Sequence, residues 1–117
     1  MENYYMLTEP QKLKAYINNK QNVVLTATGN SMRPTICTGD RITITSEIDN
    51  IIIGDIIVFF NLNSKRYIAH RIVAFLGNRL IITKGDNNSY CDQPIHKSEV
   101  IGKIINVERH RYEKILK

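Results

Sequence analysis

One serine lies in a short segment whose other residues restrict the backbone. The segment reads "TGNSMRPT", with Ser31 between a Gly-Asn pair and an Arg-Pro pair. Glycine, asparagine and proline so close together argue against a regular strand and favour a rigid turn. A serine hydroxyl held on such a turn can attack a carbonyl carbon if a base beside it takes its proton. The segment therefore indicates nucleophilic catalysis.

A histidine further along the chain is a candidate for that base. It lies in "RYIAHRIVAF" (66–75), which has the composition of a strand. Alternation places His70 on the same face as Ile68 and Ile72, whereas Arg71 points to the opposite face. Taken alone, a histidine on an apolar strand face is more often a core residue than a catalyst. Its interpretation as a base therefore depends on its combination with the serine.

An acidic loop supplies the third kind of group. In "TKGDNNSYCDQP" (83–94), Asp86 and Asp92 come directly after a predicted strand. Alone, such a polar segment is typical of turns. Together with a serine and a histidine, an aspartate completes a set of nucleophile, base and orienting acid, and this set recurs in several chain orders. The residues alone leave open whether Asp86 or Asp92 is the orienting acid.

Short elements must position these groups. A helix is expected over about residues 9–19, where "LTEPQKLKAYINNK" combines a capping residue, Thr8, with an apolar face of Leu13, Tyr16 and Ile17. After the helix, β-branched segments alternate with Gly, Asn and Asp, a pattern typical of strands and turns. Strands are predicted over 23–28, 41–45, 55–60, 66–75, 79–83 and 99–108.

The strand spacing, about ten residues, favours a mostly antiparallel barrel or sandwich. A two-residue hairpin turn is expected at Gly77-Asn78. The 117 residues are predicted to form one domain (1–117), with the N-terminal helix followed by a β core over about 23–108. A terminal helical turn is expected within 109–117.

Charge and cysteine content exclude several function classes. The net charge is +5, with the basic excess in residues 61–117, but glutamates are interleaved there and no nucleic-acid-binding motif is present. We expect a solvated basic face and no specific nucleic-acid partner. Cys37 and Cys91 lack metal-ligand spacing, so neither a metal nor another cofactor is expected.

The sequence contains no recognisable membrane-spanning or signal segment. The longest apolar stretch, "IIIGDIIVFF", spans ten positions, and a bilayer requires about 20. A cytoplasmic protein is expected on this ground, with its recruitment to a membrane by a partner left open.

Four segments, taken in order, resemble the sequence boxes of type I signal peptidases. They are "SMRPT", "GDIIVF", "HRIV" and "TKGDNNSYCD", and the resemblance covers about residues 24–105. Bacterial-type enzymes carry a lysine base in the third box, whereas this chain has His70. With a histidine at this position, the chain resembles the branch of the family found in the endoplasmic-reticulum enzyme and in some Gram-positive bacteria.

The resemblance implies a role for each site residue. Ser31 would be the nucleophile, His70 the general base, Asp92 its acidic partner and Asp86 a second aspartate that supports the site. It also implies a mainly β fold, a small coiled antiparallel β-barrel-like peptidase domain with a short N-terminal helix.

Such enzymes bind a peptide as an added β-strand and cleave it after a small residue. The receiving edges would be "LTATG" and "RYIA", which contain Ala27 and Ala69. Gly29 and Asn30 would contact the substrate beside the nucleophile, and Met32 would line the pocket for the side chain before the cleaved bond. The Ser31 N–H is the expected oxyanion donor, and any second donor from Gly29 must be main-chain.

The membrane anchor of signal peptidases has no counterpart before the serine box. We therefore expect a serine endopeptidase that acts on a leader or signal-like peptide, for example a leader on a ribosomally made modified peptide. One alternative is a non-catalytic peptide-binding module of the same fold. Another is a self-cleaving LexA-type regulator, but those use a Ser-Lys pair and a separate DNA-binding domain, and position 70 is a histidine.

Overall fold

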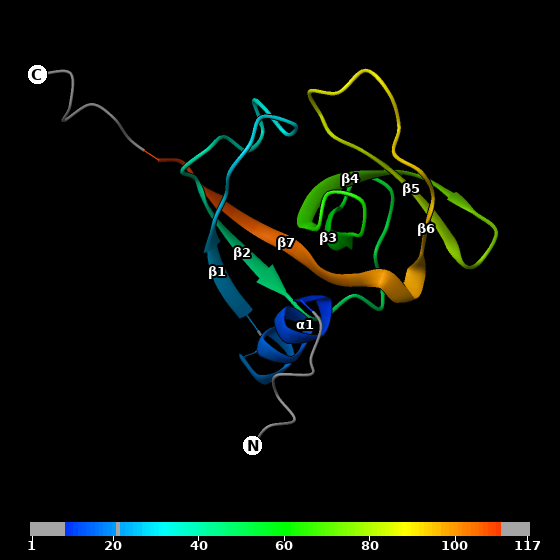
Figure 1. Cartoon of the computed structure of the whole chain (residues 1–117), viewed down its shortest axis with the longest axis horizontal. Helices are drawn as coiled ribbons and strands as arrows, with labels where there is room; N and C mark the ends of the chain where they lie inside the picture. The colour runs from blue at the N-terminus through cyan, green and yellow to red at the C-terminus, as the bar shows by residue number, and fades with distance from the viewer. Residues whose placement is uncertain (1–8, 21, 111–117) are drawn as a thin grey trace, which may run out of the picture.

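The computed structural model describes residues 9–20 and 22–110 (Figure 1). Within these residues one helix precedes seven strands, and a 3-10 turn, η2, separates the last two. The elements are α1 (Glu9–Lys20), β1 (Asn22–Thr26), β2 (Arg41–Thr45), β3 (Ile56–Asn61), β4 (Arg66–Leu76), β5 (Leu80–Lys84), β6 (Ile95–His96), η2 (Lys97–Glu99) and β7 (Val100–Glu108).

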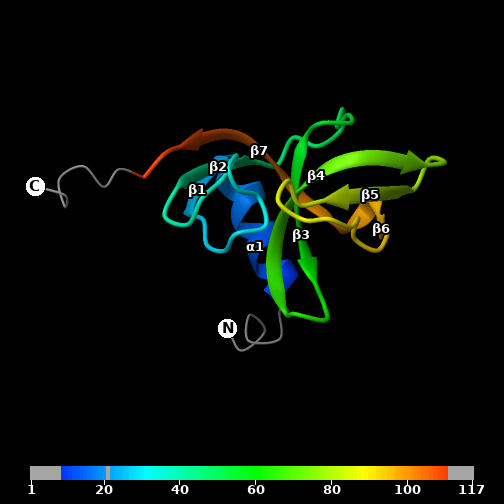
Figure 2. The ribbon, with the colours of Figure 1, turned by 90° about the horizontal axis from the view of Figure 1, so that it is seen from above.

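The strands form one antiparallel sheet in the order β1-β2-β7-β3-β4-β5-β6. Strand β7 joins the two halves, because its C-terminal part pairs with β2 and its N-terminal part with β3. Figure 2 shows β7 running from the β1–β2 side to the β3–β5 side of the molecule. The mainly β, coiled antiparallel fold with one short helix is therefore confirmed.

Strand β3 separates two hydrophobic cores. Ile56 and Val58 pack with the residues of α1, β1 and β2, whereas Ile57 and Phe59 pack with those of β4 and β5. Successive side chains of a strand point to opposite faces, so a strand buried on both faces must be apolar at every position. This requirement explains the unbroken apolar run in "IIVFF".

Helix α1 covers the first core through one side. Ile17 is 0% exposed and Leu13 packs against the same cluster, but Tyr16 is 51% exposed at the edge of that face. The expected helix is confirmed, one residue longer than predicted. The expected capping residue, Thr8, lies outside the described residues.

Two local features differ from the sequence prediction. The β4–β5 hairpin has a three-residue loop rather than a two-residue turn, because Leu76 pairs with Leu80. The third loop residue, Arg79, offers its carbonyl to the Lys97 N–H at 2.7 Å, which ties the hairpin to η2. Strand β6 and η2 were not predicted, since both are too short to have a periodic pattern. The expected terminal turn lies mostly outside the described residues.

Candidate active site

The turn after β1 holds Ser31 in place. A main-chain hydrogen bond closes this turn, in which the Arg33 N–H donates to the Asn30 carbonyl at 3.2 Å. At its start, Gly29 has φ +96°, a conformation that other residues rarely adopt. Thr38 fixes that glycine, because its hydroxyl contacts both the Gly29 N–H and the Gly29 carbonyl at 3.0 Å. The hydroxyl of Ser31 is therefore presented by a restrained turn.

His70 of β4 lies against this hydroxyl. Its Nε2 is 2.9 Å from Ser31 Oγ, and the residue is only 5% exposed. The Phe59 ring packs against the imidazole in a T-shaped contact, with 6.3 Å between the ring centroids. His70 is thus both packed in the core and hydrogen-bonded to the serine.

Asp92 lies on the other side of the imidazole. Its Oδ2 is 2.6 Å from His70 Nδ1 and accepts a second hydrogen bond from the Thr83 hydroxyl at 2.7 Å. Thr83 is 0% exposed, and its carbonyl accepts the Asp92 N–H at 2.8 Å. With the carboxylate ionised, Nδ1 carries the proton and Nε2 is left as the acceptor toward Ser31. This is the tautomer that a general base requires.

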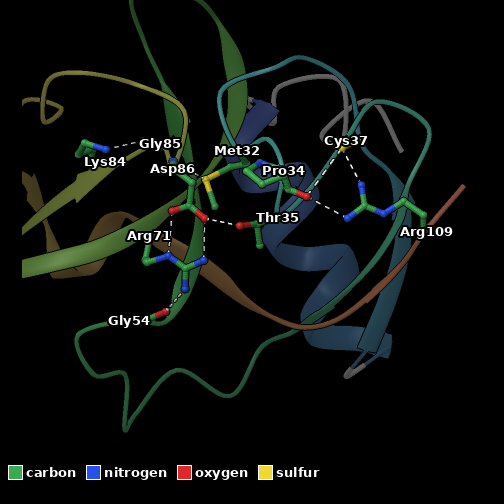
Figure 3. A network of polar contacts seen from close by, with 10 residues as sticks. All are labelled: Met32, Pro34, Thr35, Cys37, Gly54, Arg71, Lys84, Gly85, Asp86 and Arg109. Atoms are coloured by element: carbon green, nitrogen blue, oxygen red, sulfur yellow. Dashed lines mark hydrogen bonds and ion pairs between the residues drawn. The ribbon is translucent and has the colours of Figure 1, made fainter.

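Asp86 is directed away from the imidazole and toward β4 and the serine turn. Arg71 Nε and Nη2 donate to its two oxygens at 2.9 and 2.7 Å, and the Thr35 hydroxyl donates at 2.5 Å (Figure 3). The hydrogen bonds from Arg71 hold the pKa of Asp86 below its ordinary value, and Thr35 acts in the same direction. Asp86 thus connects the acidic loop to the turn that carries the serine.

The loop after β5 also approaches the serine through its main chain. The Asn87 N–H donates to the Ser31 carbonyl at 2.8 Å, and Asn87 Nδ2 donates to the Asn30 carbonyl at 3.1 Å. A Cβ atom at Gly85 would lie 2.6 Å from the Ser31 carbonyl oxygen and 3.0 Å from His70 Nε2. Only glycine fits between the two candidate catalytic residues.

A second anchor holds the far end of the serine turn. Arg109, just after β7, donates to the Pro34 carbonyl at 2.9 Å (Figure 3). It also lies 3.4 Å from the fully buried Asp40. The pKa of Asp40 is lowered, chiefly by the His110 N–H, which donates to its Oδ1 at 2.8 Å. Cys37 adds another N–H bond to the same carboxylate.

Sequence reasoning did not assign roles to Thr83, Arg71, Thr35 and Arg109. The sequence did contain a signal for Thr83. It lies two residues after Ile81 on a predicted strand, so both side chains point to the same, buried face. The partners of the other three are far away in the sequence, and local patterns do not reveal them.

A groove of about 450 Å³ leads to Ser31 and His70. Its two walls are the segments 25–28, at the end of β1, and 66–69, at the start of β4. Among the described strands, β1 pairs only with β2, and β4 pairs with β5 only from Arg71 onward. Both walls therefore present unpaired strand edges. The expected substrate-contacting residues all line the groove: Ala27, Gly29, Asn30, Met32 and Ala69.

The main-chain amides near Ser31 differ in availability. Within the described part of the chain, the Ser31 N–H donates to no other group. The Gly29 N–H is engaged by the Thr38 hydroxyl, so the suggested second oxyanion donor at Gly29 is not available in this conformation.

The chain contains a second Ser-His pair, and it lacks the surroundings of the first. Ser98 Oγ lies 2.8 Å from His96 Nδ1, but both residues are exposed and form a local cap at the start of η2. Neither Ser98 nor His96 lines the groove.

A family model described as peptidase S24-like matches residues 2–105. The chain belongs to the peptidase S24-like family. A comparison with curated proteins found no match. Membership in the peptidase S24-like family agrees with the mainly β fold and identifies the protein, at a coarse level, as a member of a serine peptidase family.

The peptidase S24-like match supports the wider superfamily that contains signal peptidases and LexA-type regulators. The match does not distinguish the type I signal peptidase branch, which the four sequence boxes resemble, from the other branches. Within residues 9–20 and 22–110, no helix is long and apolar enough to cross a bilayer.

Proposed function

We propose that this member of the peptidase S24-like family is a serine endopeptidase with a Ser31-His70-Asp92 catalytic site. The observation that carries this proposal is the continuous chain of hydrogen bonds, 2.9 Å from Ser31 to His70 and 2.6 Å from His70 to Asp92, at the end of the groove. A serine hydroxyl is a weak nucleophile at neutral pH, and a positioned base accelerates its attack by about 10²–10⁴-fold.

The geometry supports a two-step hydrolysis. Ser31 Oγ attacks the peptide carbonyl carbon while His70 Nε2 takes its proton, and Asp92 stabilises the imidazolium that forms. Collapse of the tetrahedral intermediate breaks the C–N bond, and the proton passes from His70 to the leaving amine. Water then attacks the acyl-enzyme with His70 again acting as base, which releases the N-terminal fragment. In this proposal the Ser31 N–H, which donates to no other described group, is the donor to the oxyanion.

The substrate in this proposal is an extended peptide that lies between the two unpaired strand edges. Main-chain hydrogen bonds to the segments 25–28 and 66–69 would give affinity with little demand on sequence. Ala27, Ala69 and the buried Met32 leave space near Ser31 for a small side chain before the cleaved bond. We propose that the residues before this bond occupy the groove.

His70 favours the Ser-His branch of the superfamily over the Ser-Lys regulators. A LexA-type enzyme would need a lysine base, and the group 2.9 Å from Ser31 Oγ is an imidazole. We therefore propose processing of a separate peptide substrate, of the signal-peptide or leader-peptide kind, rather than self-cleavage.

The test is a series of extended peptides that differ only in the residue before the cleaved bond, compared by kcat/KM. Peptides with Ala should be cleaved about 10²-fold faster than peptides with Phe, because a bulky side chain would hold the carbonyl about 1 Å or more away from Ser31. Ser31→Ala should be inactive in the same assay. Equal cleavage of the Ala and Phe peptides would contradict the pocket. Binding without cleavage would support the non-catalytic module.

A further inference from the structure

Arg66 brings a full positive charge to the lining of the groove. Among the described residues that line it, Arg66 is the only lysine or arginine, and no aspartate or glutamate is present. The remaining lining is mostly apolar or main-chain, with Leu13, Ile42 and Ile44 on its inner surface. An isolated cation in such a groove would attract a negative charge on the bound peptide.

Arg66 lies at the end of the groove that is remote from the catalytic pair. It is the first residue of β4, and His70 is four residues further along the same strand. At about 3.3 Å per residue, the two positions are about 13 Å apart along the strand. Ser64 lines the groove beside Arg66, at the tip of the β3–β4 hairpin.

The Arg66 guanidinium is available for a ligand. Two other arginines near the site are already paired, Arg71 with Asp86 and Arg109 with Asp40. In the part of the chain that the structure describes, the Arg66 side chain has no hydrogen-bond or ion-pair partner, and the residue is exposed. A guanidinium of this kind binds a carboxylate through two parallel hydrogen bonds.

We propose that Arg66 forms a subsite for an acidic side chain of the substrate, four to six residues before the cleaved bond. This inference rests on the proposed function in one respect, because it assumes that the bound peptide runs along β4 toward Ser31. A peptide strand advances about 3.3 Å per residue, so the side chain opposite Arg66 belongs to about the fifth residue before the cleaved bond. The arginine side chain is long enough to reach the fourth or the sixth residue as well. The preferred substrate is an extended peptide with a Glu or Asp at this distance, followed by uncharged residues that match the apolar groove.

Charge substitution on both partners tests the subsite. Peptides with Glu, Gln or Lys at the fourth, fifth or sixth position before the cleaved bond are compared by kcat/KM. For the wild-type protein, we expect the Glu peptide to exceed the Gln peptide by about two- to fivefold, as for other partly exposed ion pairs. This preference should disappear near 1 M salt, because the Debye length there is about 3 Å and the charges on an exposed pair are screened. Arg66→Gln should remove the preference, and Arg66→Glu should reverse it toward the Lys peptide.

Lys65→Gln is the matched control, because Lys65 is the neighbouring cation and does not line the groove. It should keep the wild-type preference. Equal cleavage of the Glu and Lys peptides by the wild-type protein, or an unchanged Glu preference in Arg66→Gln, would overturn the subsite.

Binding separates this inference from the catalytic proposal. Fluorescence anisotropy of labelled peptides with Ser31→Ala should show the same Glu preference without cleavage. If the wild-type protein cleaves no peptide but Arg66 still selects Glu in binding, the subsite stands and the endopeptidase proposal fails. If the peptides are cleaved but their binding is indifferent to charge, the endopeptidase proposal stands and the subsite fails.

Discussion

Asp92 Oδ2 lies 2.6 Å from His70 Nδ1, and the same oxygen accepts the hydroxyl of the fully buried Thr83. Two hydrogen bonds to one carboxylate oxygen fix both the acid and the ring that it orients. The other aspartate of the loop, Asp86, is held by Arg71 and Thr35 instead. The two acids of the loop are therefore expected to have separable functions.

Asp92→Asn should reduce kcat by about 10³–10⁴-fold. An asparagine fills the same space, but it favours the wrong imidazole tautomer and cannot stabilise the imidazolium. Steady-state cleavage of an Ala-containing peptide measures the loss, and circular dichroism should show an intact fold. A near-normal kcat in Asp92→Asn, with a large loss in Asp86→Asn, would reverse the two roles.

Asp86→Asn should act mainly on stability and its pH dependence. Pairing with Arg71 lowers the pKa of Asp86 in the folded state below its unfolded value, about 3.9. The stabilisation from this carboxylate is therefore fully present above about pH 4, and it is lost as the pH falls through the lower, folded-state pKa. At neutral pH the substitution should cost about 1–2 kcal/mol, since Arg71 is partly exposed and can regain solvent contacts.

Urea unfolding at neutral pH and below pH 4 measures this effect, and the difference between the wild-type protein and Asp86→Asn should shrink in acid. Asp49→Asn is the control, because Asp49 is exposed and its side chain has no hydrogen bond or ion pair to another described residue. A difference that stays constant from neutral pH to acid would show that the ion pair with Arg71 does not stabilise the fold.

Gly85→Ala should disturb catalysis more than stability. Its new Cβ would lie 2.6 Å from the Ser31 carbonyl oxygen, so the serine turn or the loop must move. A displacement of about 1 Å between the reacting groups reduces the rate by about 10²-fold. The kcat/KM for the same Ala-containing peptide measures this loss.

Gly102→Ala is a matched control for crowding. A Cβ at Gly102 would lie 2.5 Å from Ile44 Cγ2 and 2.8 Å from the Thr45 carbonyl, and neither atom belongs to Ser31 or His70. This variant should lower the melting temperature while kcat stays within about twofold for the folded protein. Equal losses of kcat in the two variants would mean that Gly85 has no special role beside the site.

Most of the fold could be predicted from the sequence because its strands are locally encoded. Six of the seven described strands correspond to the β-branched segments bounded by Gly, Asn and Asp, with ends that differ by at most two residues. Strand β6 was missed because two residues, Ile95 and His96, carry no periodic pattern. The order of strands in the sheet was not predictable either, since β7 is last in the chain but central in the sheet.

The site could be predicted where a residue's chemistry is visible in a motif. Ser31, His70, Asp86 and Asp92 all lie in segments with unexpected polar residues. Contacts that depend on folding were not visible: Arg109 reaches the Pro34 carbonyl across 75 positions of the chain. Such a contact depends on the path of β7 through the sheet.

The proposed catalysis depends on activation of Ser31 by His70 and Asp92. A fluorophosphonate probe followed by intact-protein and peptide mass spectrometry tests this activation. The Ser98-His96 pair serves as an internal control, because no described carboxylate bonds to the His96 ring and neither residue lines the groove. We predict one adduct per chain, on Ser31, formed at a rate that is about 10²-fold or more lower in His70→Ala. A wild-type protein whose Ser31 stays unlabelled, or is labelled no faster than Ser98, would contradict it.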